Sequence, residues 1–193
     1  MIKLKSNSSW WKQQAIEELS YGTNAKMMVG FTSPYWRAHG SSGASYSDLP
    51  NHQATWETNP TAATGTRAVL TDYSGGDRGA SLDPMKAQAA TERLLGDLDQ
   101  IFPGAYTNVA RIGSAYRVHL EHWPSNPLSK GSYTCYAPGQ FTTIAGNEGT
   151  RVGNLLFAGE HTNSFYEWQG FMEGACLSGI DAANELLADL KRR

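Results

Sequence analysis

The 193-residue sequence is poor in cysteine, with only Cys135 and Cys176, which stand far apart in the chain. Two distant thiols make neither a disulfide framework nor a metal cluster, so we expect both to be small buried residues. No run of about 18 apolar residues occurs, and the sequence therefore predicts no membrane-spanning helix. The first residues also lack the hydrophobic stretch of a signal peptide.

Neither sign of charge dominates, because 16 Lys and Arg face 18 Asp and Glu for a net charge of −2. Without a basic stripe or an acidic tail, we expect neither nucleic acid nor a membrane surface as a partner. The 40% of hydrophobic and 18% of charged residues are ordinary for a soluble globular protein. A cytoplasmic location is favoured, and export stays open if a preceding segment carries a signal.

The first 150 residues predict an α+β layer in which strands and helices mix. Asp83 is a natural N-cap and Pro84 suits the first helical position, so a helix should run from there to Phe102. Its expected buried stripe is Met85, Ala89, Leu94, Leu95, Leu98 and Ile101. The other expected elements are a helix over 10–19 and strands near 26–31, 54–58, 67–73 and 109–122.

The last part of the sequence has a different character. Residues 154–158 form a continuous apolar run, which predicts a strand buried on both faces, and a helix should follow from about Gly170 to Leu190. A strand, a loop and a helix in this order are typical of a layered α/β domain. We therefore expect a substrate-binding layer over 1–150 and the last strand and helix of a second domain over 151–193. That strand has no parallel neighbour in this sequence.

Chemistry is most concentrated between these last two elements. The carboxylate of Glu160 follows Gly159 at the carboxyl end of the expected strand, where open α/β sheets bind ligands. Gly170 and Gly174 would let a ligand approach a helix N-terminus, which favours negative charge by roughly 0.3–1 kcal/mol. Alternatively, the small residues of this helix only allow it to pack tightly against its neighbours.

These residues resemble a known family. The segment LLFAGEHTNSFYEWQGFMEGACLSGIDAANELL is similar to the C-terminal flavin-binding signature of the flavin monoamine oxidase and L-amino-acid oxidase family. YGTNAK resembles the Gly-x-x-x-Lys element of that family, and WPSNPLSKGSYTCYAPGQ resembles its stretch from a Trp to Gly-x-Tyr. The resemblance extends from about Trp11 to Leu187. It implies an FAD-binding, Rossmann-like domain beside a substrate domain with a mixed sheet.

The resemblance also implies roles for individual residues. Glu160, together with Gly159, would bind the ribityl and diphosphate part of FAD, and Trp123 would pack beside the ring. The edge of the isoalloxazine would be lined by Gly170, Phe171, Met172, Glu173, Gly174 and Ala175. Among these, Met172 would offer its backbone N–H to the flavin pyrimidine.

Three residues would act on the substrate. Tyr133 and Phe171 would form aromatic walls for a small amine, and Lys26 would lie near flavin N5, bridged by water. The implied reaction oxidises a primary or secondary amine, or an amino acid, to an imine while O2 becomes hydrogen peroxide. By themselves, a lysine is more often solvated at a surface and aromatic residues more often belong to a core.

The sequence departs from the family pattern in two ways. Ser132 stands where some members tether FAD through a Cys, so we expect non-covalent FAD. No Gly-x-Gly-x-x-Gly occurs, and the N-terminal βαβ unit that cradles the diphosphate is absent from these residues. The chain should therefore need a complementary N-terminal FAD-binding segment. The alternative is a non-catalytic remnant whose apolar strand and helix serve as a binding or oligomerisation module. Such a module could form a homo-oligomer.

Two further patterns concern metal binding and the charge of the substrate. His119 and His122 would point to opposite faces of a strand without a third ligand, so we expect no metal site. A carboxylate-binding arginine would favour amino acids as substrates. The available arginines are Arg37, Arg67, Arg111, Arg117 and Arg151, and the sequence does not select among them.

Overall fold

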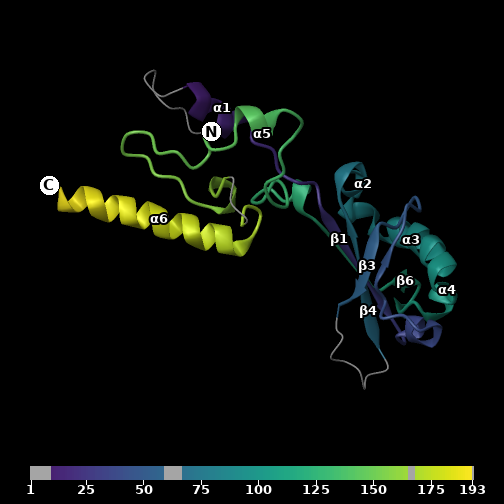
Figure 1. Ribbon diagram of the computed structural model, residues 1–193. Helices are drawn as coiled ribbons and strands as arrows, with labels where there is room; N and C mark the ends of the chain where they lie inside the picture. Colours follow the sequence, from purple (N-terminus) through teal and green to yellow (C-terminus); the bar gives the residue numbers. More distant parts are fainter. Residues whose placement is uncertain (1–9, 59–66, 165–167, 193) are drawn as a thin grey trace. The chain divides into compact units, whose positions relative to one another are not determined.

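The computed structural model describes residues 10–58, 67–164 and 168–192. The chain divides into two compact units, shown in Figure 1. We call Thr23–Ser132 the sheet unit, and Met1–Gly22 together with Tyr133–Arg193 the terminal unit. The predicted division at residue 150 concerns the domains of a longer protein rather than these compact units, and it stays a prediction.

A five-stranded sheet with the order β2-β3-β4-β1-β7 forms the centre of the sheet unit. Its pairings are all antiparallel. The strands are β1 (Ala25–Phe31), β2 (Ser45–Tyr46), β3 (Ala54–Glu57), β4 (Ala68–Ser74) and β7 (Val118–His122). The strands predicted near 26–31, 54–58 and 67–73 are thus confirmed. Lys26 on β1 lies between Tyr73 on β4 and Glu121 on β7.

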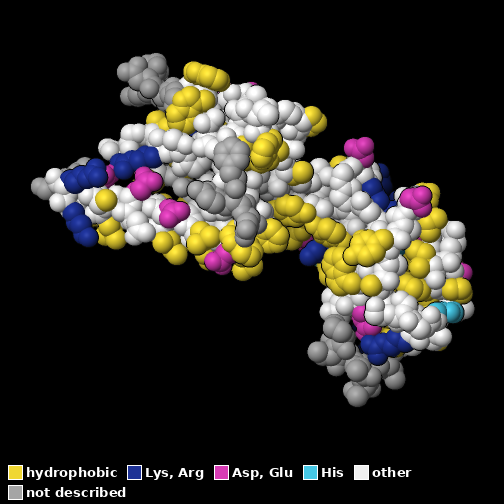
Figure 2. Space-filling view, viewed as in Figure 1, with side chains coloured by type: hydrophobic (Ala, Val, Ile, Leu, Met, Phe, Trp, Pro, Cys, Tyr) yellow, Lys and Arg dark blue, Asp and Glu magenta, His cyan; other side chains and the backbone are white. Residues whose placement is uncertain are grey.

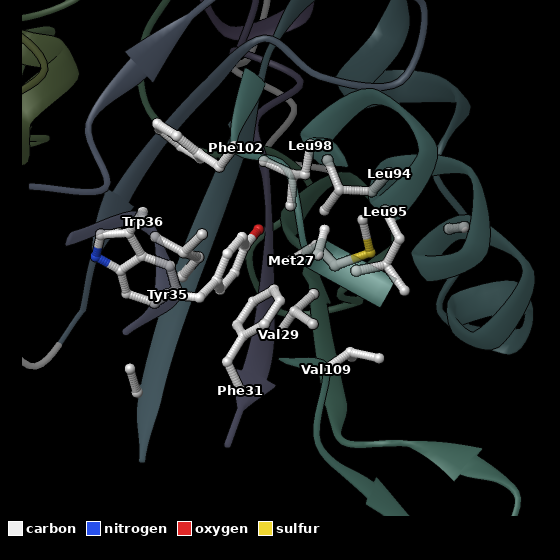
Figure 3. Packing of buried hydrophobic residues seen from close by; sticks show 14 of the residues in the cluster. Met27, Val29, Phe31, Tyr35, Trp36, Leu94, Leu95, Leu98, Phe102 and Val109 are labelled. Carbon is white, nitrogen blue, oxygen red and sulfur yellow. The ribbon is translucent and has the colours of Figure 1, made fainter. Parts of the chain in front are cut away.

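The core of this unit lies between one face of the sheet and helix α3 (Ala87–Ile101). Burial alternates along β1, so that Met27, Val29 and Phe31 face the core while Lys26, Met28 and Gly30 face the opposite side. Figure 3 shows Leu94, Leu95 and Leu98 of α3 beside these strand residues. Full burial of each leucine side chain stabilises the folded state by about 1.5–3 kcal/mol relative to an exposed leucine.

The predicted start of the long helix is confirmed, but its first turn differs. The side chain of Asp83 accepts a hydrogen bond of 2.9 Å from the Met85 amide, as expected of an N-cap. A 3-10 turn, η2 (Pro84–Lys86), then precedes α3. Met85 is 92% exposed and Ala89 is also exposed, which corrects the prediction that both are buried. The buried face of α3 carries Ala90, Leu94 and Leu98, and the helical period of 3.6 residues turns Ala89 away from it.

The long strand predicted over 109–122 is wrong. The segment instead folds into a hairpin of β5 (Arg111–Ile112) and β6 (Ala115–Tyr116), followed by β7. Gly113 at the turn has a φ of 60°, a left-handed conformation that glycine adopts without strain and that reverses the chain. Other short elements of this unit are η1 (Tyr35–His39), α2 (Gly76–Ser81), α4 (Ala105–Asn108) and η3 (Trp123–Ser125).

The terminal unit joins segments from both ends of the sequence. Gly22 N donates a 2.7 Å hydrogen bond to Tyr133 O, and Cys135 N donates one of 3.1 Å to Ser20 O. Its elements are α1 (Trp10–Glu18), α5 (Gln140–Thr143), η4 (Glu160–Thr162) and α6 (Met172–Lys191). The helices predicted over 10–19 and from about 170 to 190 are thus confirmed. Cys135 and Cys176 are both exposed, which corrects their expected burial.

The strand predicted over 154–158 does not form. The segment shows only an isolated bridge between Val152 and Leu155, and Leu155 is 45% exposed. A strand is stabilised by pairing with a neighbour, and among the described residues no strand lies beside this run. The apolar sequence is therefore present without the sheet that it would complete.

Candidate functional site

The signature segment begins with a glycine that is tied to α6. The hydroxyl of Ser178 accepts a 3.0 Å hydrogen bond from Gly159 N. The same hydroxyl donates a 3.0 Å hydrogen bond to Gly159 O. Gly159 has a φ of 140°, and a Cβ there would lie 2.6 Å from Cε1 of His161. Glycine is therefore required at this position by the backbone of the chain itself.

Glu160 connects three segments through its carboxylate. One oxygen accepts hydrogen bonds from the amide and the hydroxyl of Thr134, at 3.0 and 2.9 Å. The other accepts a bond of 2.7 Å from the Gly170 amide. Burial raises the pKa of the nearby Tyr21 hydroxyl, and the negative charge of Glu160 raises it further. The predicted contact of Glu160 with FAD would have to use the remaining lone pairs of these oxygens.

Glycine stands at positions 170 and 174 of the signature for two different structural reasons. A Cβ on Gly174 would lie 2.2 Å from Trp168 O, so this glycine allows the chain to pack against itself. Gly170 has a φ of +84°, and its missing side chain faces the Tyr133 ring, whose Cδ2 would lie 3.6 Å away. The packing interpretation accounts for Gly174, whereas Gly170 leaves room beside an aromatic ring.

The start of α6 is open to solvent. Tyr133 is 40% exposed, Phe171 59% and Met172 88%, while Glu173 and Ala175 are also exposed. Phe171 is the N-cap of this 20-residue helix and makes no side-chain capping bond. Amides in the first turn of a helix lack partners within it and attract negative charge. A flavin would fit here, because its pyrimidine side carries the negative charge in the reduced state.

A buried polar cluster, which sequence reasoning did not find, joins α1 to the loops around Glu148 and His161. The ammonium group of Lys12 donates to Asn147 O at 3.1 Å and to Glu148 O, and it lies 3.5 Å from the centroid of the Phe157 ring. Burial lowers the pKa of Lys12 to about 8, although the charge of Glu148 opposes the change. The Lys12 side chain thereby joins α1 to the loop before the signature.

Glu148 extends the same cluster to the signature loop. Its carboxylate accepts from the hydroxyl of Tyr136, and Gln169 Nε2 donates to that hydroxyl at 2.9 Å and to His161 O at 3.2 Å. Burial, with the hydrogen bond to Glu148, raises the pKa of Tyr136 to about 12. Burial likewise lowers the pKa of His161.

A cavity of about 350 Å³ opens between the loop around Gly149 and α6. Asn163 lines it and is only 7% exposed, yet its Oδ1 has no hydrogen-bond partner within the part of the chain that the structure describes. Buried acceptors are nearly always paired in proteins. The cavity therefore offers an acceptor to a hydrogen-bond donor that enters it.

Two predicted site residues belong to the sheet unit. Lys26 lies on the face of β1 away from the core, with its ammonium group 5.7 Å from the centroid of the Tyr73 ring. That ring packs against Trp56, with 5.6 Å between centroids. Trp123 begins η3 directly after β7 and is half-buried. The other predicted site residues lie together in the terminal unit.

Other classes of site find no support in the described residues. No three His, Cys, Asp or Glu side chains there gather closely enough to hold a metal ion. His119 is exposed and His122 buried, as expected for opposite faces of a strand. Among the helices described, none is both long and apolar enough to cross a membrane.

Comparison with known proteins identifies the relatives of this chain. The family model of flavin containing amine oxidoreductases matches residues 2–187. Polyamine oxidase 3 of Oryza sativa subsp. japonica is 28% identical over 95% of this chain and 36% of its own length. An L-amino-acid oxidase of Siganus canaliculatus is 27% identical over 91% of the chain and 32% of its own length. Flavin-containing amine oxidase B of Mus musculus is 28% identical over 91% of this chain and 33% of its own length.

Solved structures show the same fold. The cyclohexylamine oxidase from Brevibacterium oxydans IH-35A superposes with a TM-score of 0.76 at 23% identity, covering 98% of this chain and 40% of that protein. A putrescine oxidase variant also superposes with a TM-score of 0.76, at 18% identity, covering 97% of this chain and 40% of that protein. The chain thus spans about a third of the length of these curated relatives.

Proposed function

Because the chain belongs to the family of flavin-containing amine oxidoreductases, we propose that it is the C-terminal part of an FAD-dependent amine oxidase. The complete enzyme would oxidise an amine or amino acid to an imine and reduce O2 to hydrogen peroxide. The single observation that carries this proposal for the chain's own residues is the exposed, uncapped start of α6 beside Tyr133, held by Glu160.

Exposed apolar surface supports the need for a complementary N-terminal segment. The outer face of α6 carries large apolar side chains that are at least half exposed, namely Ile180, Leu186, Leu187 and Leu190. Figure 2 shows hydrophobic side chains at several places along this helix. Contiguous apolar patches on a protein surface mark interaction sites. A βαβ unit packed on α6 and paired with residues 154–158 would cover them.

Each chain residue would have a defined role with the flavin bound. Amides at the start of α6, Met172 N among them, would donate to its pyrimidine side. Tyr133 and Phe171 would confine the neutral substrate amine, since aromatic faces orient an amine without protonating it. Lys26 would hold a water molecule beside N5. Bound FAD would accept a hydride from the carbon beside the amine and return two electrons to O2.

The flavin would be held without a covalent bond. The residue before Tyr133 is Ser132, whose hydroxyl donates a 2.7 Å hydrogen bond to Asn24 Oδ1. A serine hydroxyl offers no thiolate for a thioether bond to the ring. Retention of the cofactor would therefore depend on contacts from both segments.

Co-expression tests the proposal. The chain would be produced alone and together with an N-terminal Gly-x-Gly-x-x-Gly segment of a polyamine oxidase relative. The proposal expects the paired sample to bind FAD, which denaturation then releases, and to form hydrogen peroxide from amines. A chain that forms stable oligomers and leaves every such partner unbound would instead fit a non-catalytic binding module.

A further inference from the structure

Three arginines of the sheet unit line one cavity. The cavity has a volume of about 390 Å³ and lies where β1 ends and β4 begins. The arginines are Arg67, Arg111 and Arg117, all exposed, and none of the described residues that line the cavity is acidic. Val69 and Ala110 supply an apolar wall, whereas Phe31 borders the cavity only at the end of β1, because its ring is buried in the core on the other face.

Backbone hydrogen bonds fix the position of Arg117. Gly30 N donates to Arg117 O at 2.9 Å, Ala110 N donates to Gly30 O at 2.8 Å, and Arg117 N donates to Ala110 O at 2.9 Å. A Cβ on Gly30 would lie only 3.3 Å from the Arg117 Cβ. The arginine is therefore held against β1 by a closed set of main-chain contacts.

The sheet register brings Arg67 to the same place. Gly30 is directly opposite Val69, and Arg67 stands immediately before β4, two residues from Val69, where it lines the same cavity. Arg111 approaches from β5, with its guanidinium stacked 4.0 Å from the centroid of the Tyr116 ring and donating to Ser114 O at 2.9 Å. A stacked guanidinium keeps further N–H groups free for a ligand.

These arginines differ from the paired ones elsewhere in the chain. Arg37 forms an ion pair of 2.8 Å with Glu57, and Arg151 pairs with Asp189. Within the described residues, no salt bridge involves any of the three cavity arginines. Like charges gathered around one hollow repel one another, and an anion bound between them removes that cost.

We propose that this cavity binds a small organic dianion of the phosphate-monoester class. Guanidinium groups match phosphate oxygens with paired N–H donors, and a phosphate monoester carries a charge of about −1.5 to −2 at neutral pH. The cavity volume suits a small molecule rather than a polymer. An apolar substituent on the phosphate would lie against Val69 and Ala110.

The site is separate in its chemistry from amine oxidation. Lys26 and Gly30 stand four residues apart on β1, which is about 13 Å along a strand. Phenyl phosphate carries no amine, so its binding at the arginines does not depend on the oxidation of an amine near Lys26. The inference therefore stands independently of the proposed oxidase function.

Titration of the full 193-residue chain with phenyl phosphate tests the proposal by calorimetry and by NMR. We expect saturable binding, with shifts confined to the amides around Gly30, Ala110 and Arg117. Arg67→Gln and Arg117→Gln should each weaken binding about tenfold, because each removes a charge-assisted hydrogen bond. Benzoate, with a single charge, should bind at least about tenfold more weakly.

Arg93→Gln is the matched control, because Arg93 is an exposed arginine on α3 outside the cavity. It should bind phenyl phosphate as tightly as the parent chain. The proposal is overturned if phenyl phosphate fails to saturate at about 10 mM, if shifts centre elsewhere, or if Arg93→Gln weakens binding as much as the cavity variants do. Equal binding of benzoate would also overturn the assignment of a dianion.

Discussion

The carboxylate of Glu160 accepts a 2.7 Å hydrogen bond from the amide of Gly170, ten residues further along the chain. Its other oxygen is bound by Thr134, the neighbour of Tyr133. One side chain thus holds two aromatic-bearing segments, around Tyr133 and Phe171, on a common surface. The signature glutamate consequently organises the candidate site within the chain before any cofactor is bound.

Replacing Glu160 with glutamine should destabilise the terminal unit. Glu160→Gln keeps the size of the side chain but exchanges an acceptor oxygen for an NH2 donor, which must then face a donor of Thr134 or Gly170. We expect the free energy of unfolding to fall by about 1–3 kcal/mol, measured by urea denaturation. The exposed control Glu173→Gln should cost less than about 1 kcal/mol. A Glu160→Gln chain as stable as the parent would contradict the bridging role.

Two glycines in α6 should respond oppositely to alanine. In Gly174→Ala the new Cβ would lie 2.2 Å from Trp168 O, so we expect a loss of about 1–3 kcal/mol or more. Gly179 has open space around its Cβ position, and Gly179→Ala should stabilise the helix by up to about 1 kcal/mol. The midpoints of thermal unfolding of the two variants, measured by circular dichroism, test both expectations. The close packing at Gly174 is refuted if both variants shift the midpoint in the same direction.

The stability of the chain should depend on the titration of Lys12. Burial lowers its pKa in the folded chain from 10.5 to about 8. Between these values the unfolded chain keeps a proton that the folded chain has released, so the free energy of unfolding rises with pH across this window. Urea denaturation at a series of pH values should show that the Lys12→Met chain lacks this rise. If the free energy of unfolding of the parent and Lys12→Met chains changed with pH in the same way, the titration of Lys12 would not be the cause of the rise.

Lys26 should affect the reaction with oxygen but not folding. Its side chain lies on the face of β1 away from the core, so Lys26→Met should leave the urea midpoint unchanged. In the reconstituted enzyme we expect reoxidation by O2 to slow about tenfold or more, because a charge placed beside the reacting centre is lost. Stopped-flow measurement with Lys86→Met, an exposed lysine, as control checks this. Equal oxygen rates in both variants would remove Lys26 from the proposed site.

Much of the sheet unit could be predicted because its pattern is local. The alternation of Met27, Val29 and Phe31 with half-exposed residues fixes both the strand and its buried face. Asp83 and Pro84 mark the start of a helix through backbone chemistry that needs no distant partner. The family signature added the site residues of the terminal unit by resemblance.

The errors arose where structure depends on distant or missing partners. Residues 154–158 have the composition of a central strand, but pairing requires neighbours that the described residues do not provide. Lys12 was missed because a lysine in a helix is ordinarily solvated, and only the folded loop at Asn147 and Glu148 supplies carbonyl acceptors for it. Cys176 was expected to be buried, yet it lies on a helix whose outer face is uncovered.

The most direct test of the account is whether this chain takes up FAD with an N-terminal Gly-x-Gly-x-x-Gly segment but not without it. We predict that the co-purified pair carries close to one releasable FAD per complex and that Met172 amide exchange slows on assembly, while the chain alone stays colourless. A pair that co-purifies without flavin, or a flavin bound with the start of α6 still fully exchangeable, would contradict the account.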